Sequence, residues 1–173
     1  ERNRVEREGR EKAERERERA DGEARKAQLE RERTNKAFSR AKSLVDAQRV
    51  IDWGEGNEKL LAILRKGASE SDPDSVWLTE AGRLLYKTND REMHPDARRY
   101  LEEAIRLDTE RAYEALYYLH LIEKFGEEEF WSRYLSEIVR RANAINDKEN
   151  VFVLNSRCMK AMDDGNLDEA LDL

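Results

Sequence analysis

Apolar residues recur at helical spacing along most of the chain. In residues 97–109 they fall at Ala97, Leu101 and Ala104, which are positions i, i+4 and i+7 of one helical face. Arginine and glutamate occupy many of the other positions, so one side of the segment is apolar and the other is charged. Two alanines on either side of a leucine leave room for a neighbouring helix. The segment is therefore predicted to be a helix that packs closely against other helices.

The same spacing predicts a series of helices joined by short turns. A long helix is expected from the N-terminus to Trp53, followed by a turn at 54–57 and a second helix that ends at 71–74. Further helices are expected up to residue 88 and at 96–108, 110–125, 127–144, 151–162 and from 167 onward. No alternating apolar and polar run of strand length competes with them. The predicted fold class is all-α, with a long charged helix followed by antiparallel helical hairpins.

The first 36 residues differ from the rest of the chain in composition. They consist mostly of Glu, Arg, Lys and Ala, which are strong helix formers. Glutamates often precede a basic residue by four positions, as in Glu32–Lys36, and each such pair adds roughly 0.2–0.5 kcal/mol to a helix. Fraying is expected only near Gly22. We therefore divide the chain into a charged helix at 1–36 and a helical repeat domain at 37–173.

A weak heptad seam runs along the charged helix into the following segment. Its positions alternate in steps of three and four residues if Arg17, Arg31 and Thr34 are included. The other members are apolar but mostly small: Ala13, Ala20, Ala24, Ala27, Phe38, Ala41 and Val45. Larger apolar residues are usual at these positions of a coiled coil. Two hypotheses stay open: a solvated single helix or flexible linker that acts as a spacer, and a homodimer that pairs through residues 13–45.

Charge and hydropathy argue against several classes of protein. The chain is 38% hydrophobic and 42% charged, with a net charge of −6. Residues 1–36 contain thirteen basic and eleven acidic residues, and this interleaving cancels the positive field that nucleic-acid binding needs. No apolar run reaches the roughly 18–20 residues of a membrane span, and no signal peptide is visible. The single cysteine, Cys158, suits a reducing compartment, so a cytoplasmic location is expected.

Two segments resemble the tetratricopeptide repeat, a helix–turn–helix unit of about 34 residues. Residues 97–109 have the A-x3-L-x2-A spacing of its second helix, with Thr109 in the place of the usual proline. In the tail, Gly165 and Ala170 match the turn glycine and the alanine that follows it. Elsewhere the resemblance is weaker, because Trp131 stands where alanine is usual and the period drifts from 34 to 39 residues. A generic stack of helical hairpins, an α-solenoid, is the alternative.

The resemblance implies a groove that binds a protein or peptide. In the family, the first helices of successive repeats line a concave surface. Carried over by position, that surface would consist of Thr79, Arg83, Tyr86, Lys87, His120, Lys124, Asn155 and Met159. Arg83, Lys87 and Lys124 would hold a carboxylate or an acidic segment by charge-assisted hydrogen bonds. The last unit lacks most of its second helix, so further repeats are expected beyond Leu173 in a longer parent protein.

The residues that usually carry catalysis or bind metal are few and scattered. His94 lies in a loop, where a surface or capping role is expected, and His120 lies in an aromatic helix, where a core or groove position is expected. Cys158 stands near Arg157 and Lys160 but is small enough to be buried in its helix. No phosphate-binding loop or nucleophile motif is present in the sequence. We expect no enzyme activity, no cofactor and no bound metal.

Three functional hypotheses follow from these patterns. The first is a non-catalytic interaction or scaffold module, part of a larger multidomain signalling protein, whose repeats present a protein-binding groove. The second is structural: the long helix pairs to form an elongated oligomer. The third is a regulatory domain that docks on an upstream enzyme domain of the same protein. Pairing of the 13–45 seam would favour the second hypothesis, and the third requires a catalytic domain upstream.

Overall fold

The computed structural model describes residues 2–108, 112–123, 131–147, 149–163 and 165. The α-helices are α1 Arg2–Trp53, α2 Asn57–Ser71, α3 Ser75–Lys87, α4 His94–Leu107, α5 Tyr113–Glu123, α6 Trp131–Ala144 and α7 Val151–Asp163. A short 3-10 helix at Arg91–Met93 precedes α4, and the described residues contain no strand. The all-α prediction is confirmed. The expected eighth helix and the expected first residues of the fifth and sixth helices lie outside the described residues.

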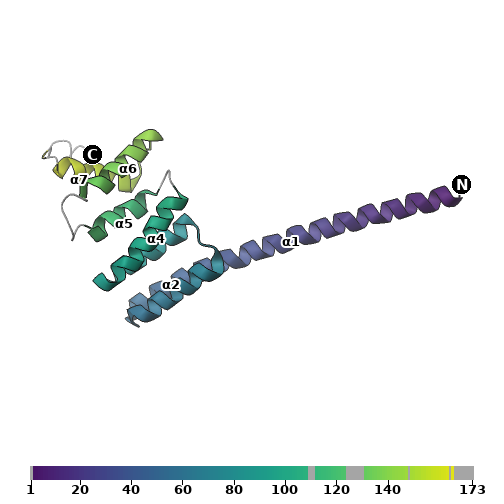
Figure 1. The fold of residues 1–173 in the computed structure, drawn as a ribbon, viewed down its shortest axis with the longest axis horizontal. Coiled ribbons are helices and arrows are strands. Elements are labelled where there is room, and N and C mark those ends of the chain that lie inside the picture. Colours follow the sequence, from purple (N-terminus) through teal and green to yellow (C-terminus); the bar gives the residue numbers. More distant parts are fainter. Residues whose placement is uncertain (1, 109–111, 124–130, 148, 164, 166–173) are drawn as a thin grey trace.

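Helix α1 is a single uninterrupted helix of 52 residues. The fraying expected near Gly22 does not occur, and the helix also runs without a break across the proposed boundary at residue 36. Residues 14–38 are exposed except for the half-buried Gly22. The first buried residue described in α1 is Ser43. Most of α1 therefore projects from the bundle as a free arm (Figure 1). The division into two domains stays a prediction.

The turns between helices have identifiable local causes. After α1, Gly54 and Gly56 take φ values of 65° and 99°, a region of backbone conformation that glycine adopts most easily. The side chain of Asp74 accepts a hydrogen bond from the backbone N–H of Trp77 at 2.8 Å and so caps α3. The extra residues between α3 and α4 form the 3-10 turn, and its Met93 is 8% exposed.

The helices pack as successive hairpins: α1 with α2, α3 with α4, and α5 with α6. The odd-numbered helices also contact one another in order, α1 with α3, α3 with α5 and α5 with α7. Figure 1 shows this stack running from α2 past α4 and α5 to α6 and α7. Such neighbour relations are those a stack of hairpins requires. The solenoid arrangement itself stays a prediction.

The core follows the apolar pattern of the sequence closely. On α4 the predicted face of Ala97, Leu101 and Ala104 is fully buried. On α3 every predicted core residue is at most 3% exposed: Trp77, Leu78, Ala81, Leu84 and Leu85. These residues belong to one cluster that joins α1, α2, α3, α4 and α5. Burial of this face is therefore what holds the hairpins together.

Helices α3 and α4 approach each other closely at Gly82. A Cβ atom at this position would lie 2.6 Å from Cγ of Leu101 and 3.1 Å from the carbonyl oxygen of Ala97. Leu101 is fully buried, so its side chain has little room to move away. Glycine is therefore required at this crossing for steric reasons.

Replacement of Gly82 by alanine is expected to lower the free energy of unfolding by about 1–3 kcal/mol, because the added methyl group overpacks the crossing. The matched control is Gly22→Ala on the free arm, where nothing lies within 4 Å of the Cβ position. That change should increase the helical circular dichroism signal and leave the thermal midpoint of the bundle unchanged. Urea and thermal unfolding of both variants test the pair. Equal midpoints for Gly82→Ala and the wild type would contradict the close approach.

Candidate functional site

The odd-numbered helices present one surface on which polar and aromatic side chains gather. We call it the odd-helix face. Its half-buried members come from α3, α5 and α7: Arg83, Tyr86, Glu114, Tyr117, Tyr118 and Phe152. On α5 the three residues Glu114, Tyr117 and Tyr118 follow helical spacing on the side opposite to the buried Leu116 and Leu119. Helix α5 therefore places its leucines in the core and these three residues on the odd-helix face.

A continuous chain of aromatic rings crosses the odd-helix face. The ring centroids of Tyr86 and Tyr118 are 5.7 Å apart, which links α3 to α5. Tyr118 and Tyr117 follow at 6.1 Å in an edge-to-face arrangement, and Tyr117 then lies 5.6 Å from Phe152 on α7. His94, the first residue of α4, stacks on Tyr86 at 6.2 Å. These rings offer apolar faces and polar edges at the surface.

The charges on this face are largely paired within the chain. Arg83 donates to Glu80 through Nε at 2.6 Å and also through Nη2. This pairing raises the pKa of Arg83 above its usual value, while burial and the nearby Glu80 raise the pKa of Glu114. Burial also raises the pKa of Tyr118. Arg83 therefore lies between two carboxyl groups, and the face is not a simple basic site.

The structure brings most of the predicted groove residues to the odd-numbered helices. Thr79 is half-buried and donates a hydrogen bond to the carbonyl oxygen of Ser75 at 2.8 Å. Lys87 and Asn155 are exposed, and Met159 is half-buried. The remaining two predicted residues are His120 and Lys124.

His120 is 1% exposed and lies in the core, so it cannot contact a partner in this conformation. Lys124 falls outside the described residues. On α5, the half-buried residues Glu114, Tyr117 and Tyr118 reach the surface instead. In the sequence, only the spacing of Glu114 and the two tyrosines indicates this outer side of α5. Because α5 is apolar on nearly all sides, the sequence does not distinguish its exposed side from its buried side.

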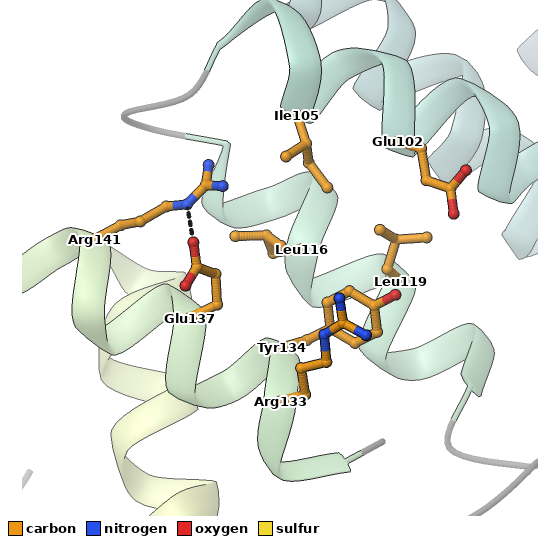
Figure 2. A pocket seen from close by; sticks show the side chains of 8 residues that line it. All are labelled: Glu102, Ile105, Leu116, Leu119, Arg133, Tyr134, Glu137 and Arg141. Carbon is orange, nitrogen blue, oxygen red and sulfur yellow. Dashed lines mark hydrogen bonds and ion pairs between the residues drawn. The ribbon is translucent and has the colours of Figure 1, made fainter. Parts of the chain in front are cut away.

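A second feature, a hollow between α4, α5 and α6, lies on the other side of α5 (Figure 2). It has a volume of about 460 Å³. Apolar side chains from α4 and α5 meet charged side chains from α4 and α6: Glu102, Ile105, Leu116, Leu119, Arg133, Tyr134, Glu137 and Arg141. The hollow thus combines an apolar part with charged groups.

One ion-pair network on α6 includes Glu137 and Arg141, which line this hollow. Nε of Arg141 donates to Glu137 at 2.8 Å, and Arg140 donates two hydrogen bonds to the same carboxylate at 2.7 Å (Figure 2 shows the Arg141 pair). The arginines, Arg140 most strongly, lower the pKa of Glu137 to about 2. Nearby, Glu123 of α5 pairs with Arg98 of α4 and accepts from the Tyr134 hydroxyl at 3.4 Å. The first network therefore lies within α6, whereas the second connects α4, α5 and α6.

Among the described side chains, no group of three or more His, Cys, Asp or Glu is positioned to bind a metal ion. Cys158 is half-buried on α7, and His94 lies against Tyr86, where burial lowers its pKa. In the described part of the chain, no helix is both long and apolar enough to cross a bilayer.

Comparison of the chain with protein-family models, with curated proteins and with solved structures gave no match. The surfaces described above are therefore the basis for any functional assignment.

Glu137 provides a test of the network on α6. A carboxyl group whose native pKa is below its unfolded value stabilises the fold above the unfolded pKa, here 4.5, and loses that contribution as the pH falls towards 2. Glu137→Gln is therefore expected to lower the free energy of unfolding at pH 7 by about 1 kcal/mol, with a gap that shrinks below pH 4.5.

Urea unfolding at pH 7, 4 and 2.5 measures this gap against the wild type. Glu149→Gln, at an exposed position between α6 and α7, is the matched control and should leave stability unchanged at each pH. A destabilisation by Glu137→Gln that is independent of pH would show that the carboxylate charge is not the cause.

Proposed function

We propose that this chain is a non-catalytic protein-interaction module whose odd-helix face binds an extended peptide segment of a partner protein. The observation that carries the proposal is the chain of rings from Tyr86 to Phe152, which crosses three helices without a break. Tyrosine side chains bury a large area while keeping a polar edge in water, and they lose little conformational entropy on binding. The half-buried state of these rings is what a peptide-binding surface requires.

The charges refine the chemistry of the ligand. The resemblance to the tetratricopeptide repeat implies that Arg83, Lys87 and Lys124 hold a carboxylate or an acidic segment. Arg83 is already paired with Glu80 and lies near Glu114, so an incoming carboxylate would meet two acidic groups as well as the guanidinium. We therefore favour a ligand with apolar or aromatic side chains over a strongly acidic one. Its main-chain groups would pair with the tyrosine hydroxyls and polar side chains along the face.

This function fits a scaffold or regulatory segment within a larger protein, including one that docks on another domain of the same chain. The resemblance of 97–109 to a tetratricopeptide repeat and the contacts between successive odd-numbered helices support it. Cys158 forms no disulfide with another described residue, which fits the cytoplasm, where thiols stay reduced.

The proposal is tested by selecting linear peptides from a random library on the full 173-residue chain and measuring their affinity by calorimetry. Enriched peptides should contain apolar or aromatic residues. Replacing Tyr118 or Phe152 by alanine should weaken their binding at least about tenfold, because a central aromatic contact is lost. Tyr118→Phe keeps the ring and should retain most of the affinity.

The matched control is Leu107→Ala at the end of α4, where the side chain is 48% exposed and lies off the odd-helix face. It should leave peptide affinity unchanged. Circular dichroism checks that each variant keeps its helical content. The proposal fails if no peptide is enriched, or if the enriched peptides bind equally well to Tyr118→Ala and Phe152→Ala.

A further inference from the structure

Helix α1 has two different sides along its last part. One side packs on the bundle through Ser43, Ala47 and Val50, which are 9%, 0% and 2% exposed. Phe38 and Val45 fall roughly half a turn away from these residues around the helix and are 69% and 67% exposed. Phe38 and Val45 are one heptad apart and so lie on the same side of the helix, as residues in the seam of a coiled coil do.

This exposed side continues along the free arm in one register. The residues that extend it at steps of three and four are all exposed: Arg17, Ala20, Ala24, Ala27, Arg31, Thr34 and Ala41. We call the whole line from Arg17 to Gln48 the α1 seam. Gln48 is half-buried at the bundle end of the seam, and the arm that carries most of the seam projects freely (Figure 1). The exposed part of the seam is therefore accessible to a helix from another molecule.

We propose that the α1 seam binds the same seam of a second copy, as an antiparallel two-helix coiled coil centred between Glu32 and Arg33. In this register Phe38 lies opposite Ala27 of the second copy, and Val45 lies opposite Ala20. Each of these large side chains thus faces a small one, so neither contact overfills the interface. The symmetry of the pair repeats both contacts, so the interface is self-complementary.

The orientation follows from the two arginines of the seam. In a parallel pair in register, Arg17 and Arg31 would each face their own copies across the core. In the antiparallel register Arg31 lies opposite Thr34 of the second copy, and Arg17 lies opposite Gln48. Their aliphatic stems cover the interface while the guanidinium groups reach water. The antiparallel arrangement therefore removes like-charge contacts from the core.

The positions that flank the seam agree with the same register. In an antiparallel pair Asp21 lies beside Lys42 of the second copy, and Glu14 lies beside Arg49, so both flanking charge pairs are attractive. Lys42 and Arg49 now pair with Asp46 of their own helix, and their side chains remain 61% and 50% exposed. They are therefore accessible to a second copy.

The opposite orientation lacks these attractions. In a parallel pair Glu16 would lie beside Asp21 of the second copy, which is repulsive. In the antiparallel register Glu23 and Glu30 instead lie beside Leu44 and Ala37 of the second copy. The favoured occupant of the seam is therefore another molecule of this chain, because its own sequence supplies both the apolar match and the charge match.

The first test is the solution mass of the full chain by light scattering after size exclusion, at roughly 100 μM and on dilution. We expect a dimer in equilibrium with monomer. Phe38→Glu should raise the dissociation constant at least about tenfold, because it places a charge in the core of the interface. Val76→Glu changes an apolar residue that is 75% exposed on α3, away from the seam, and should leave the dimer intact.

Disulfide cross-linking tests the orientation in a Cys158→Ser background. Chains with Ala24→Cys mixed with chains with Ala41→Cys should form the mixed disulfide dimer, because these positions face each other in the antiparallel register. A parallel dimer would instead link Ala41→Cys chains to themselves. A wild-type chain that stays monomeric, or cross-linking only between identical positions, would overturn the proposal.

The α1 seam and the odd-helix face lie on different parts of the molecule, so their tests are independent. Phe38→Glu should leave peptide binding by the odd-helix face unchanged, and Tyr118→Ala should leave the dimer unchanged. Loss of both properties in one variant would indicate unfolding, which circular dichroism detects.

Discussion

The rest of the structure depends on the burial of Trp77, where four helices meet. Its indole N–H, on α3, points at the carbonyl oxygen of Arg40 at 3.2 Å and the hydroxyl of Ser43 at 3.1 Å, both on α1. A Cβ atom at Gly67 of α2 would lie 2.5 Å from that hydroxyl, so any side chain there would force the helices apart. Tyr100 of α4 adds an edge-to-face contact with the Trp77 ring at 5.9 Å. Because the buried indole has its hydrogen-bond partners, it fixes α1 against α2 and the α3–α4 hairpin without an unsatisfied donor.

This anchor determines which surfaces remain free. Only the last part of α1 is held in the bundle, so its earlier residues stay in water as a helix of charged residues. The short helices after it each bury one side against their neighbours, and the opposite side of α5 carries Tyr117 and Tyr118. The odd-helix face and the α1 seam are thus what remains after the core has been formed. Because these two surfaces are separate, a substitution in one need not affect binding at the other.

The sequence predicted the fold well where burial leaves a clear period. Ala97, Leu101 and Ala104 mark one face because arginine and glutamate fill much of the rest of α4. The same reasoning fails on α5, where apolar and aromatic residues occur all round and nothing distinguishes core from surface. His120 was assigned to the surface by family position, yet its ring is buried beneath Tyr117 at a centroid distance of 6.3 Å. Which tyrosines reach the surface depends on how α3 and α7 pack against α5, and the sequence of α5 alone does not contain this information.

Pairing through the α1 seam would place two odd-helix faces in one dimer, so a partner with two binding segments could bind both. In the antiparallel register Ala47, in the middle of the anchored segment, lies level with residue 18 of the second copy, so the two bundles are offset by 29 residues, or about 44 Å of helix. A partner with two binding segments would need a linker long enough to reach both faces, and each bound segment would then raise the effective concentration of the other. A thin, alanine-weighted seam is suited to this use, because it makes dimerisation reversible and lets the second binding event stabilise the pair.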